Sequence, residues 1–224
     1  MIYVISDIHG CYDKYKEMLE KIHLSGEDKL YVLGDCADRG EYGIDVWLDL
    51  MRHTNVIPIM GNHDDMALKF MRVWRNPELI TESFEEDISL WIYNGGRPTL
   101  ESFQRQNEFI QDELVRYIKS FSLFEEVSIN GKNYFLAHSI GEQAGLELNN
   151  YSRRDYIWGR PNYNKCYDPE RILVTGHTPT GLISKKSTGS IYKKNNHIAI
   201  DCGAIYSRGR LGCICLDTME EFYV

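Results

Sequence analysis

Three short polar motifs, each directly after an apolar run, constrain the fold of this chain more than any other feature. The motifs begin at nearly even intervals and are Ser6-Asp7-Ile8-His9-Gly10, Gly34-Asp35-Cys36-Ala37-Asp38-Arg39-Gly40 and Gly61-Asn62-His63-Asp64. The runs before them are typical of buried strands, and apolar residues at helical spacing follow each motif. This repetition predicts successive βα units with right-handed crossovers, and a parallel sheet whose loops meet at one edge.

The first half of the chain therefore alternates predicted strands and helices. We expect strands at 2–5, 29–33 and 56–60, and helices at 12–22, 44–51 and 66–74. From about residue 81 to 121 the strand signal fades, and helices are expected at 88–93, 100–103 and 114–121, broken at Asn94-Gly95-Gly96 and at Pro98. We interpret this segment as a helical insert that walls a cleft.

The second half of the chain is rich in short β-type stretches. They lie at 126–129, 134–137, 172–175, 197–201, 211–216 and 220–224, and they fit a second sheet packed on the first. Residues 149–165, rich in Tyr, Asn and Arg, are predicted to form a long irregular loop. Because no linker is visible, we expect a single domain over 1–224 of the α/β (α+β) class, with the insert at about 81–121.

The composition excludes several classes of function. The 224-residue chain has a formal net charge of -8, whereas binding a phosphate backbone needs a basic face, so we expect no nucleic-acid partner. Its six cysteines form no C-x-x-C pair and indicate a reducing compartment. A strand is predicted within two residues of the N-terminus, and no long apolar stretch occurs. We therefore expect a cytoplasmic protein without a signal peptide or a membrane span.

The polar residues at the predicted strand ends are of the types that bind transition metals. Asp7 and His9 can both reach one ion, and Asn62 offers a neutral oxygen to a second. Asp35 is our candidate for a carboxylate shared by the two ions, which lie about 3.5–4 Å apart in such sites. Two later strand ends contribute further imidazoles, those of His138 and His177. This ligand set suits manganese, iron or zinc, and we expect two divalent ions, manganese foremost.

Hydrolysis of a phosphate ester also needs a proton for the departing alkoxide and positive charge for the phosphoryl oxygens. His63 follows Asn62 and is placed beside the ions without binding them, so we assign it as the acid, oriented and kept protonated by Asp38. Arg39 offers the bidentate fork that matches phosphate oxygens. A second arginine is expected across the site: the candidate is Arg160, and its rivals are Arg153 and Arg154.

Each of these residues has a simpler structural explanation when it is taken alone. Asp7 suits a helix N-cap, Asp35 with Arg39 suits a salt-bridged turn, and a single histidine is more often a core or surface residue. Jointly these explanations fail, because they do not account for metal-type side chains that recur where strands end. His23, His53 and His197 lack partner motifs and are interpreted as structural. Cys36 lies between the candidate catalytic residues of the second motif, and we interpret it as a structural thiol rather than a redox switch.

The motifs D-x-H-G, G-D-x-x-D-R-G and G-N-H-D, followed by His138 and Gly176-His177, resemble the phosphoprotein phosphatase branch of the calcineurin-like metallophosphoesterases, especially its bacterial and phage lambda type. The resemblance implies two packed mixed β-sheets flanked by helices, and a dinuclear metal centre. In the family pattern one ion is held by Asp7, His9 and Asp35, and the other by Asp35, Asn62, His138 and His177. The family's acid pair and phosphate clamps match His63 with Asp38, and Arg39 with Arg160.

The same resemblance implies a serine/threonine protein phosphatase, with phosphotyrosine as a further substrate, acting on a phosphoprotein, a phosphopeptide or a small phosphate ester. Asp64 departs from the pattern, because protein phosphatases of this group usually have Glu there, and G-N-H-D also resembles symmetrical diadenosine tetraphosphate hydrolases. Asp38 favours the phosphatase, since those hydrolases usually lack an acidic residue at that position. A non-catalytic metal-binding or phosphoprotein-binding module is a third hypothesis, disfavoured because the acid and every expected ligand are present.

Overall fold

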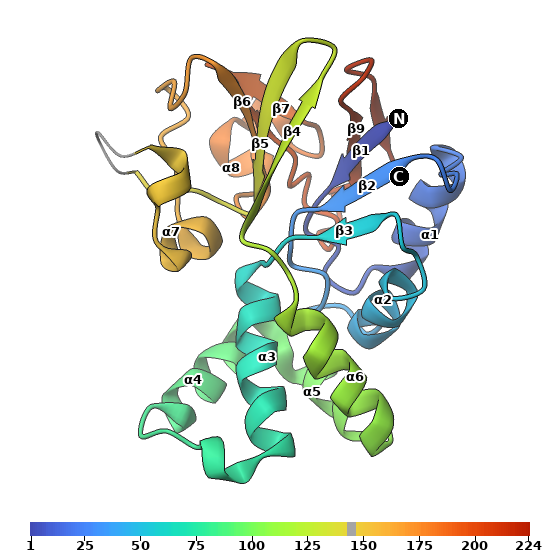
Figure 1. Ribbon diagram of the computed structural model, residues 1–224, viewed down its shortest axis with the longest axis vertical. Helices are drawn as coiled ribbons and strands as arrows, with labels where there is room; N and C mark the ends of the chain where they lie inside the picture. The colour runs from blue at the N-terminus through green and yellow to red at the C-terminus, as the bar shows by residue number, and fades with distance from the viewer. Residues whose placement is uncertain (143–146) are drawn as a thin grey trace.

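Two five-stranded sheets form the centre of the computed structural model, which describes residues 1–142 and 147–224 (Figure 1). The first sheet has the order β10-β9-β1-β2-β3, with β1 at Ile2–Ile5, β2 at Lys29–Val32, β3 at Val56–Pro58, β9 at Gly212–Cys215 and β10 at Glu221–Tyr223. The second has the order β4-β5-β6-β8-β7, with β4 at Phe124–Ile129, β5 at Lys132–Ala137, β6 at Arg171–Thr175, β7 at Tyr192–Lys194 and β8 at His197–Ala199. Both sheets contain parallel and antiparallel pairs, which confirms the predicted class.

The predicted βα units are present, but the first sheet is larger than expected. Strands β1, β2 and β3 pair in parallel, and each is followed by a helix: α1 (Tyr12–Lys21), α2 (Gly43–Leu50) and α3 (Asn62–Arg75). The stretches at 211–216 and 220–224 were assigned to the second sheet, which is wrong, because β9 pairs antiparallel with β1 and carries β10. Strand β9 is buried on both faces, so its side chains do not indicate which sheet it joins. Edge strand β7 was missed.

The helices of the insert gather below the sheets in Figure 1. They are α4 (Phe84–Trp91), the π-helical turn η2 (Ile92–Gly96), α5 (Arg97–Gln104) and α6 (Glu108–Lys119), preceded by a 3-10 turn, η1 (Pro77–Leu79). The expected break at Pro98 is wrong, because this proline lies in the first turn of α5, where its missing N–H has no helical partner to lose. No helix among residues 1–142 and 147–224 is long and apolar enough to cross a membrane.

The segment 149–165 is more regular than predicted. A 3-10 turn, η3 (Leu148–Asn150), leads into helix α7 (Arg153–Trp158), whose N-terminus has a capping box formed by Ser152 and Asp155. The expectation of one long irregular loop is therefore wrong, because this short-range capping signal outweighs the polar composition. After β6 follow the short helix α8 (Thr180–Ile183) and a 3-10 turn, η4 (Lys185–Ser187).

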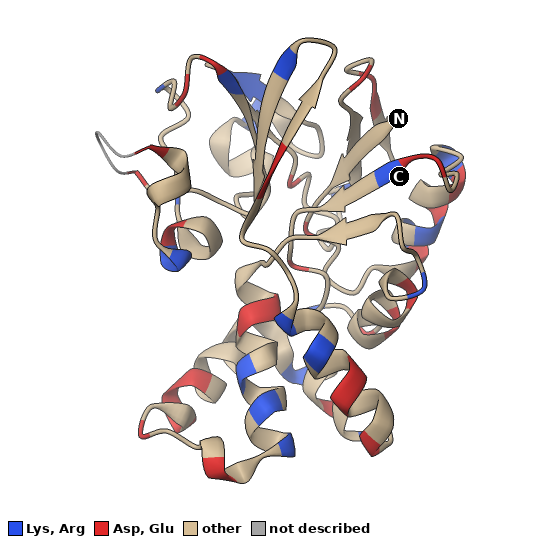
Figure 2. Ribbon diagram, viewed as in Figure 1, with Lys and Arg blue, Asp and Glu red and all other residues tan. Residues whose placement is uncertain are grey.

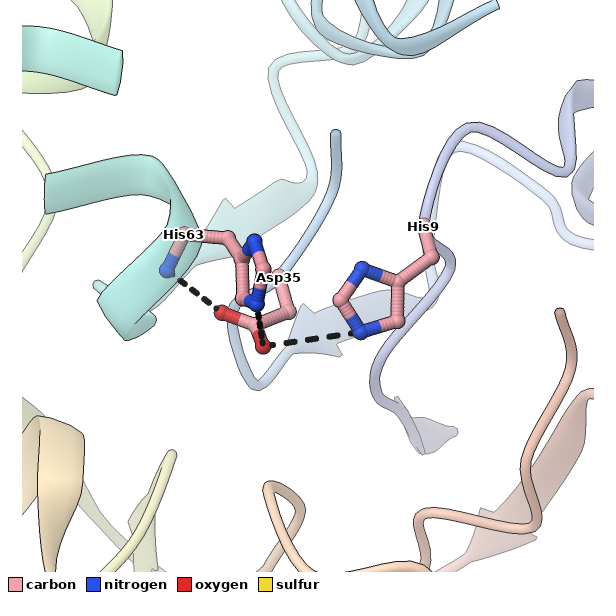
Figure 3. Close-up of side chains that lie close together, drawn as sticks. All are labelled: His9, Asp35 and His63. Carbon is pink, nitrogen blue, oxygen red and sulfur yellow. Dashed lines mark hydrogen bonds and ion pairs between the residues drawn. The ribbon is translucent and has the colours of Figure 1, made fainter. Parts of the chain in front are cut away.

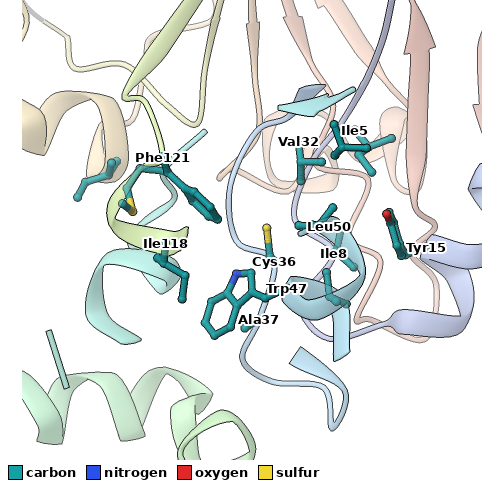
Figure 4. Close-up of a cluster of buried hydrophobic side chains, with 14 of the residues drawn as sticks. Ile5, Ile8, Tyr15, Val32, Cys36, Ala37, Trp47, Leu50, Ile118 and Phe121 are labelled. Atoms are coloured by element: carbon teal, nitrogen blue, oxygen red, sulfur yellow. The ribbon is translucent and has the colours of Figure 1, made fainter. Parts of the chain in front are cut away.

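The core consists of two clusters of buried residues, and one of them lies between the two sheets. Alternate residues such as Val4 and Ile214 face the second sheet, where they meet Leu136 and Val174. The other face of the first sheet packs on α1, α2 and the helices of the insert. Figure 4 shows Cys36 and Ala37 within this second cluster, close to Trp47 of α2. The loop that follows β2 is thus anchored by its own apolar residues, and all six cysteines are free thiols.

Candidate metal centre

The predicted metal-type side chains do converge, and all of them are buried. Asp7 and His9 follow β1, and Asp35 follows β2. The remaining ligands come from the first turn of α3 and from the ends of β5 and β6: Asn62, His138 and His177. Because β1 and β2 are parallel, and β5 and β6 are parallel, their carboxyl ends meet where the two sheets adjoin the insert (Figure 1).

Left-handed backbone angles concentrate at this place. The residues concerned are Asp7 (φ 52°), His9 (φ 47°), Asp35 (φ 54°), Asp38 (φ 70°), Arg39 (φ 67°) and His177 (φ 64°). Such a conformation costs a non-glycine residue about 1–3 kcal/mol and is retained only where the surroundings impose it. Positive φ angles also occur elsewhere, at His23, Asn130, Asn195, Asn196 and Met219, but six residues with a predicted chemical role share this conformation at one place, which supports a functional site here.

One group of possible ligands contains His9, Asp35 and His63, as Figure 3 shows. Nε2 of His9 lies 3.6 Å from Oδ2 of Asp35, and Nε2 of His63 lies 4.0 Å from the same oxygen. Nδ1 of His9 lies 3.1 Å from the carbonyl of Ala37 and must donate to it, which leaves the Nε2 lone pair facing Asp35. Burial is the main cause that lowers the pKa of His9, and the nearby Arg39 and His63 lower it further. The imidazole is therefore neutral and able to bind a cation.

A second group shares Asp35 and adds His138 and His177. Nε2 of His138 lies 3.5 Å from Oδ1 of Asp35, 3.1 Å from Oδ1 of Asn62 and 3.2 Å from Nδ1 of His177. Nδ1 of His138 donates to the carbonyl of Leu33 at 2.6 Å, so its Nε2 also presents a lone pair. Burial, with His138 and Arg160, lowers the pKa of His177 to about 3. Each oxygen of Asp35 therefore faces one of the two groups.

Asp7 tests whether this arrangement fits metal ions. Its Oδ2 accepts from the hydroxyl of Ser6 and from the backbone N–H of His177, whereas its buried Oδ1 has no partner among the described residues. That Oδ1 lies 3.9 Å from Nε2 of His9. Burial, with Asp35, raises the pKa of Asp7 to about 6, because negative charge accumulates here away from water. An orphaned carboxylate oxygen beside converging lone pairs is what a divalent cation would satisfy, so the residues fit metal ions.

The expected contact between His63 and Asp38 is present. Nδ1 of His63 donates to Oδ2 of Asp38 at 2.7 Å. Burial alone would lower the pKa of His63, but Asp35 and Asp38 outweigh it, and the pKa is raised. Arg39 donates to Nε2 of His9 at 2.5 Å and to Nε2 of His63 at 3.0 Å, so its guanidinium lies directly against the possible ligands. A cation bound by His9 would take the lone pair that Arg39 uses and would free this fork for another acceptor.

The three candidate arginines of the second clamp lie in different surroundings. Arg160 donates to the hydroxyl of Thr178 at 3.3 Å and so stands beside His177. Arg153, on α7, is bound to Asp65 at 2.6 Å. Arg154 is exposed on the same helix. Arg160 therefore lies near the metal-type residues, whereas Arg153 is held in an ion pair with Asp65.

Asp64, which departs from the protein phosphatase pattern, points away from the possible ligands. Its Oδ2 accepts from the backbone N–H of Asp35 at 2.7 Å and from that of Gly61 at 3.1 Å. Its Oδ1 accepts from the backbone N–H of Cys36 and from the indole of Trp47, both at 3.2 Å. Asp64 thus fixes the loop that carries Asp35. The sequence did not predict this role, because the motif G-N-H-D does not show which N–H groups the Asp64 carboxylate accepts from.

We expect Asp64→Ala to lower the free energy of unfolding by about 2–4 kcal/mol, since it leaves buried donors without an acceptor. Denaturant unfolding measures the change. Asp45→Ala, at an exposed position of α2, is the control and should change stability by less than about 0.5 kcal/mol. Equal stability of the two variants would show that Asp64 does not hold the loop.

Neutral imidazoles, a shared carboxylate and adjacent guanidinium groups together suit the hydrolysis of a phosphate ester with divalent metal ions. The fold and the site thus define a metal-dependent phosphoesterase. The sequence profile of the calcineurin-like phosphoesterase family matches residues 1–203, and the chain belongs to this family.

Individual relatives divide between two activities. Serine/threonine-protein phosphatase 2 of Salmonella typhimurium is 31% identical over 140 residues, which are 62% of this chain and 57% of that protein. A symmetrical bis(5'-nucleosyl)-tetraphosphatase of Buchnera aphidicola is 29% identical over 210 residues, which are 83% of this chain and 72% of that protein. A crystal structure assigned to a diadenosine tetraphosphatase superposes with a TM-score of 0.67 and 18% identity, covering 100% of this chain and 92% of the other. The last likeness concerns the fold alone.

Proposed function

We propose that this protein is a phosphomonoesterase that hydrolyses phosphoserine and phosphothreonine esters, with phosphotyrosine as a further substrate. The observation that carries the proposal is the buried His63–Asp38 pair, joined at 2.7 Å beside Asp35. Two divalent ions, which we propose to be manganese, would supply an activated water and neutralise phosphoryl charge. The ligands proposed for them are Asp7, His9, Asp35, Asn62, His138 and His177.

An acid at this position favours an ester over an anhydride as the substrate. The alkoxide that leaves a serine or threonine ester is strongly basic and needs a proton as the P–O bond breaks. A nucleoside phosphate that leaves an anhydride is a weak base and departs without one. Nε2 of His63 would deliver the proton to the leaving oxygen, while Asp38 accepts from Nδ1 and stabilises the charged ring. Because Arg39 donates to this Nε2, His63 can carry the proton only when the guanidinium has turned to the substrate.

Arg39 and Arg160 are proposed to bind the phosphoryl oxygens. We expect Arg160→Ala to raise KM and lower kcat/KM by about 10- to 100-fold, since one charge-assisted hydrogen bond to a phosphate is lost. Steady-state kinetics with a phosphopeptide measure the effect. Arg154→Ala, on the exposed face of α7, is the matched control and should leave both constants within about twofold. The opposite ranking of the two variants would assign the clamp to Arg154.

Hydrolysis of symmetrical dinucleoside polyphosphates is the second candidate function. The Buchnera relative favours it, because its match covers more of this chain than the match to the Salmonella phosphatase does. In Figure 2 the acidic residues of α3 and α6 lie toward the start of each helix and the basic residues toward its end, so neither helix is basic along its whole length.

Turnover of a phosphoserine peptide and of diadenosine tetraphosphate, compared with manganese present, tests the proposal. We expect the larger kcat/KM for the phosphopeptide. A strong preference for the nucleotide would contradict the proposal and establish the second candidate.

A further inference from the structure

The helical insert makes a direct contact with the acid pair that no motif indicates. The indole Nε1 of Trp91, at the end of α4, donates to Oδ2 of Asp38 at 2.7 Å. The same oxygen accepts from Nδ1 of His63, also at 2.7 Å. Trp91 and Asp38 are both 0% exposed, and the second oxygen of Asp38 has no partner among the described residues. The orientation of the Asp38 carboxylate thus depends on its two hydrogen bonds, one from the indole of Trp91 and one from the imidazole of His63.

We propose that Trp91 is a positioning residue for the acid. It holds the Asp38 carboxylate so that Oδ2 meets Nδ1 of His63, which keeps Nε2 aimed at the leaving oxygen. A carboxylate that lacked the indole would be free to rotate toward its unpartnered oxygen, and the imidazole would lose its fixed direction. This inference rests on the proposed function, because it assigns to Trp91 an effect on proton transfer to the leaving group.

Two further contacts from the insert hold the backbone of the same loop. The N–H of Asp38 donates to the hydroxyl of Thr99 at 3.0 Å, and the N–H of Arg39 donates to the carbonyl of Gly95 at 2.8 Å. Asp38 and Arg39 both have left-handed φ angles, 70° and 67°, which need outside support. The insert therefore fixes the acid's partner and the phosphate clamp by backbone contacts as well as through Trp91.

The break at Asn94-Gly95-Gly96 is explained by these contacts. Gly95 has a φ of 101°, and a Cβ there would lie 2.9 Å from Cγ of Arg39. A Cβ on Gly96 would lie 2.4 Å from the indole of Trp91. Phe70 of α3 packs on that indole, with ring centroids 5.3 Å apart. The two glycines thus let the chain pass close to Arg39 and Trp91 at once, and the indole is held in one place.

A positioning role differs from a merely structural one in its dependence on the leaving group. Loss of proton delivery slows the hydrolysis of an ester with a basic leaving group and barely affects one whose leaving group departs unprotonated. General loosening of the site would slow both esters alike. Trp91→Phe separates these cases, since it removes the N–H donor and keeps an aromatic ring. Trp74→Phe is the matched control: Trp74 is 45% exposed and packs on the same Phe70, with centroids 5.8 Å apart.

The experiment measures kcat for a phosphoserine peptide and for 2,4-dinitrophenyl phosphate with manganese present. We expect Trp91→Phe to lose about 10- to 100-fold on the peptide and less than about threefold on the activated ester, with unchanged manganese content. Trp74→Phe should match the unmodified protein on both. Trp91→Phe introduced into His63→Asn should cause no further loss on the peptide, because both changes act through the same proton.

Equal losses on the two esters, or losses that multiply in the double variant, would overturn the inference and leave the proposed function intact. If the unmodified protein hydrolyses neither ester, the proposed function fails and the inference fails with it. Should Trp91→Phe not fold, Thr99→Val removes the acceptor for the N–H of Asp38 at nearly constant shape. The same discrimination between the esters is then expected from Thr99→Val, and its absence would overturn the inference.

Discussion

Asp35→Asn is expected to lower turnover of a phosphate ester by roughly a thousandfold or more, and to weaken the binding of both metal ions rather than one. The reason is that Oδ2 of Asp35 faces His9 at 3.6 Å while Oδ1 faces His138 at 3.5 Å. Asparagine has nearly the same shape but presents only one oxygen, and its NH2 group cannot bind a cation. Metal analysis of the desalted protein, together with kcat, measures both effects.

Asp49→Asn is the matched control for this substitution. Asp49, on α2, is also a buried carboxylate and is 5% exposed. It forms an ion pair with Lys16 of α1 at 3.3 Å, away from the possible ligands. We expect this variant to keep the metal content of the unmodified protein. An Asp35→Asn protein that still holds two ions with unchanged affinity would show that Asp35 is not shared between them.

His63→Asn is expected to retain the metal ions and to lose about 10²- to 10⁴-fold in turnover of unactivated esters, the range for removal of a general acid. His63 lies in the first group of possible ligands, but its Nδ1 is engaged by Asp38, and its Nε2 accepts from Arg39 and stands 4.0 Å from Asp35. On 2,4-dinitrophenyl phosphate the loss should be small, because that leaving group needs no proton. Steady-state kinetics on the two esters measure the difference.

His197→Asn controls for the loss of a buried imidazole. His197 is 2% exposed and bonds to Thr175 at 2.8 Å, and it belongs to neither group of possible ligands. We expect its kinetics to stay within a few-fold of the unmodified protein on both esters. Unchanged rates in His63→Asn would remove His63 from the mechanism and with it the preference for esters over anhydrides.

The convergence of the metal-type residues was predictable because it follows from local pattern and one topological rule. An apolar run followed by a polar motif identifies a strand end, and parallel strands bring such ends to one edge. This reasoning placed Asp7, His9 and Asp35 together, and it extended to His138 and His177 because β5 and β6 are also parallel.

Contacts between distant elements were not predictable in this way. Strand β9 is buried on both faces, so its pairing with β1 left no mark in the alternation of its residues. The bond from Trp91 to Asp38 joins residues 53 positions apart, and a tryptophan at the end of an amphipathic helix is usually a core residue. The glycines at 95 and 96 were visible as a break, but their close approach to Arg39 and Trp91 depends on the folded insert.

The stoichiometry of manganese binding, determined by calorimetric titration of metal-free protein, tests the central claim most directly. Two ions per chain are predicted, with hydrolysis of 2,4-dinitrophenyl phosphate appearing as they bind and disappearing when a chelator removes them. A single ion per chain, or hydrolysis that persists in the metal-free protein, would contradict a two-metal phosphoesterase.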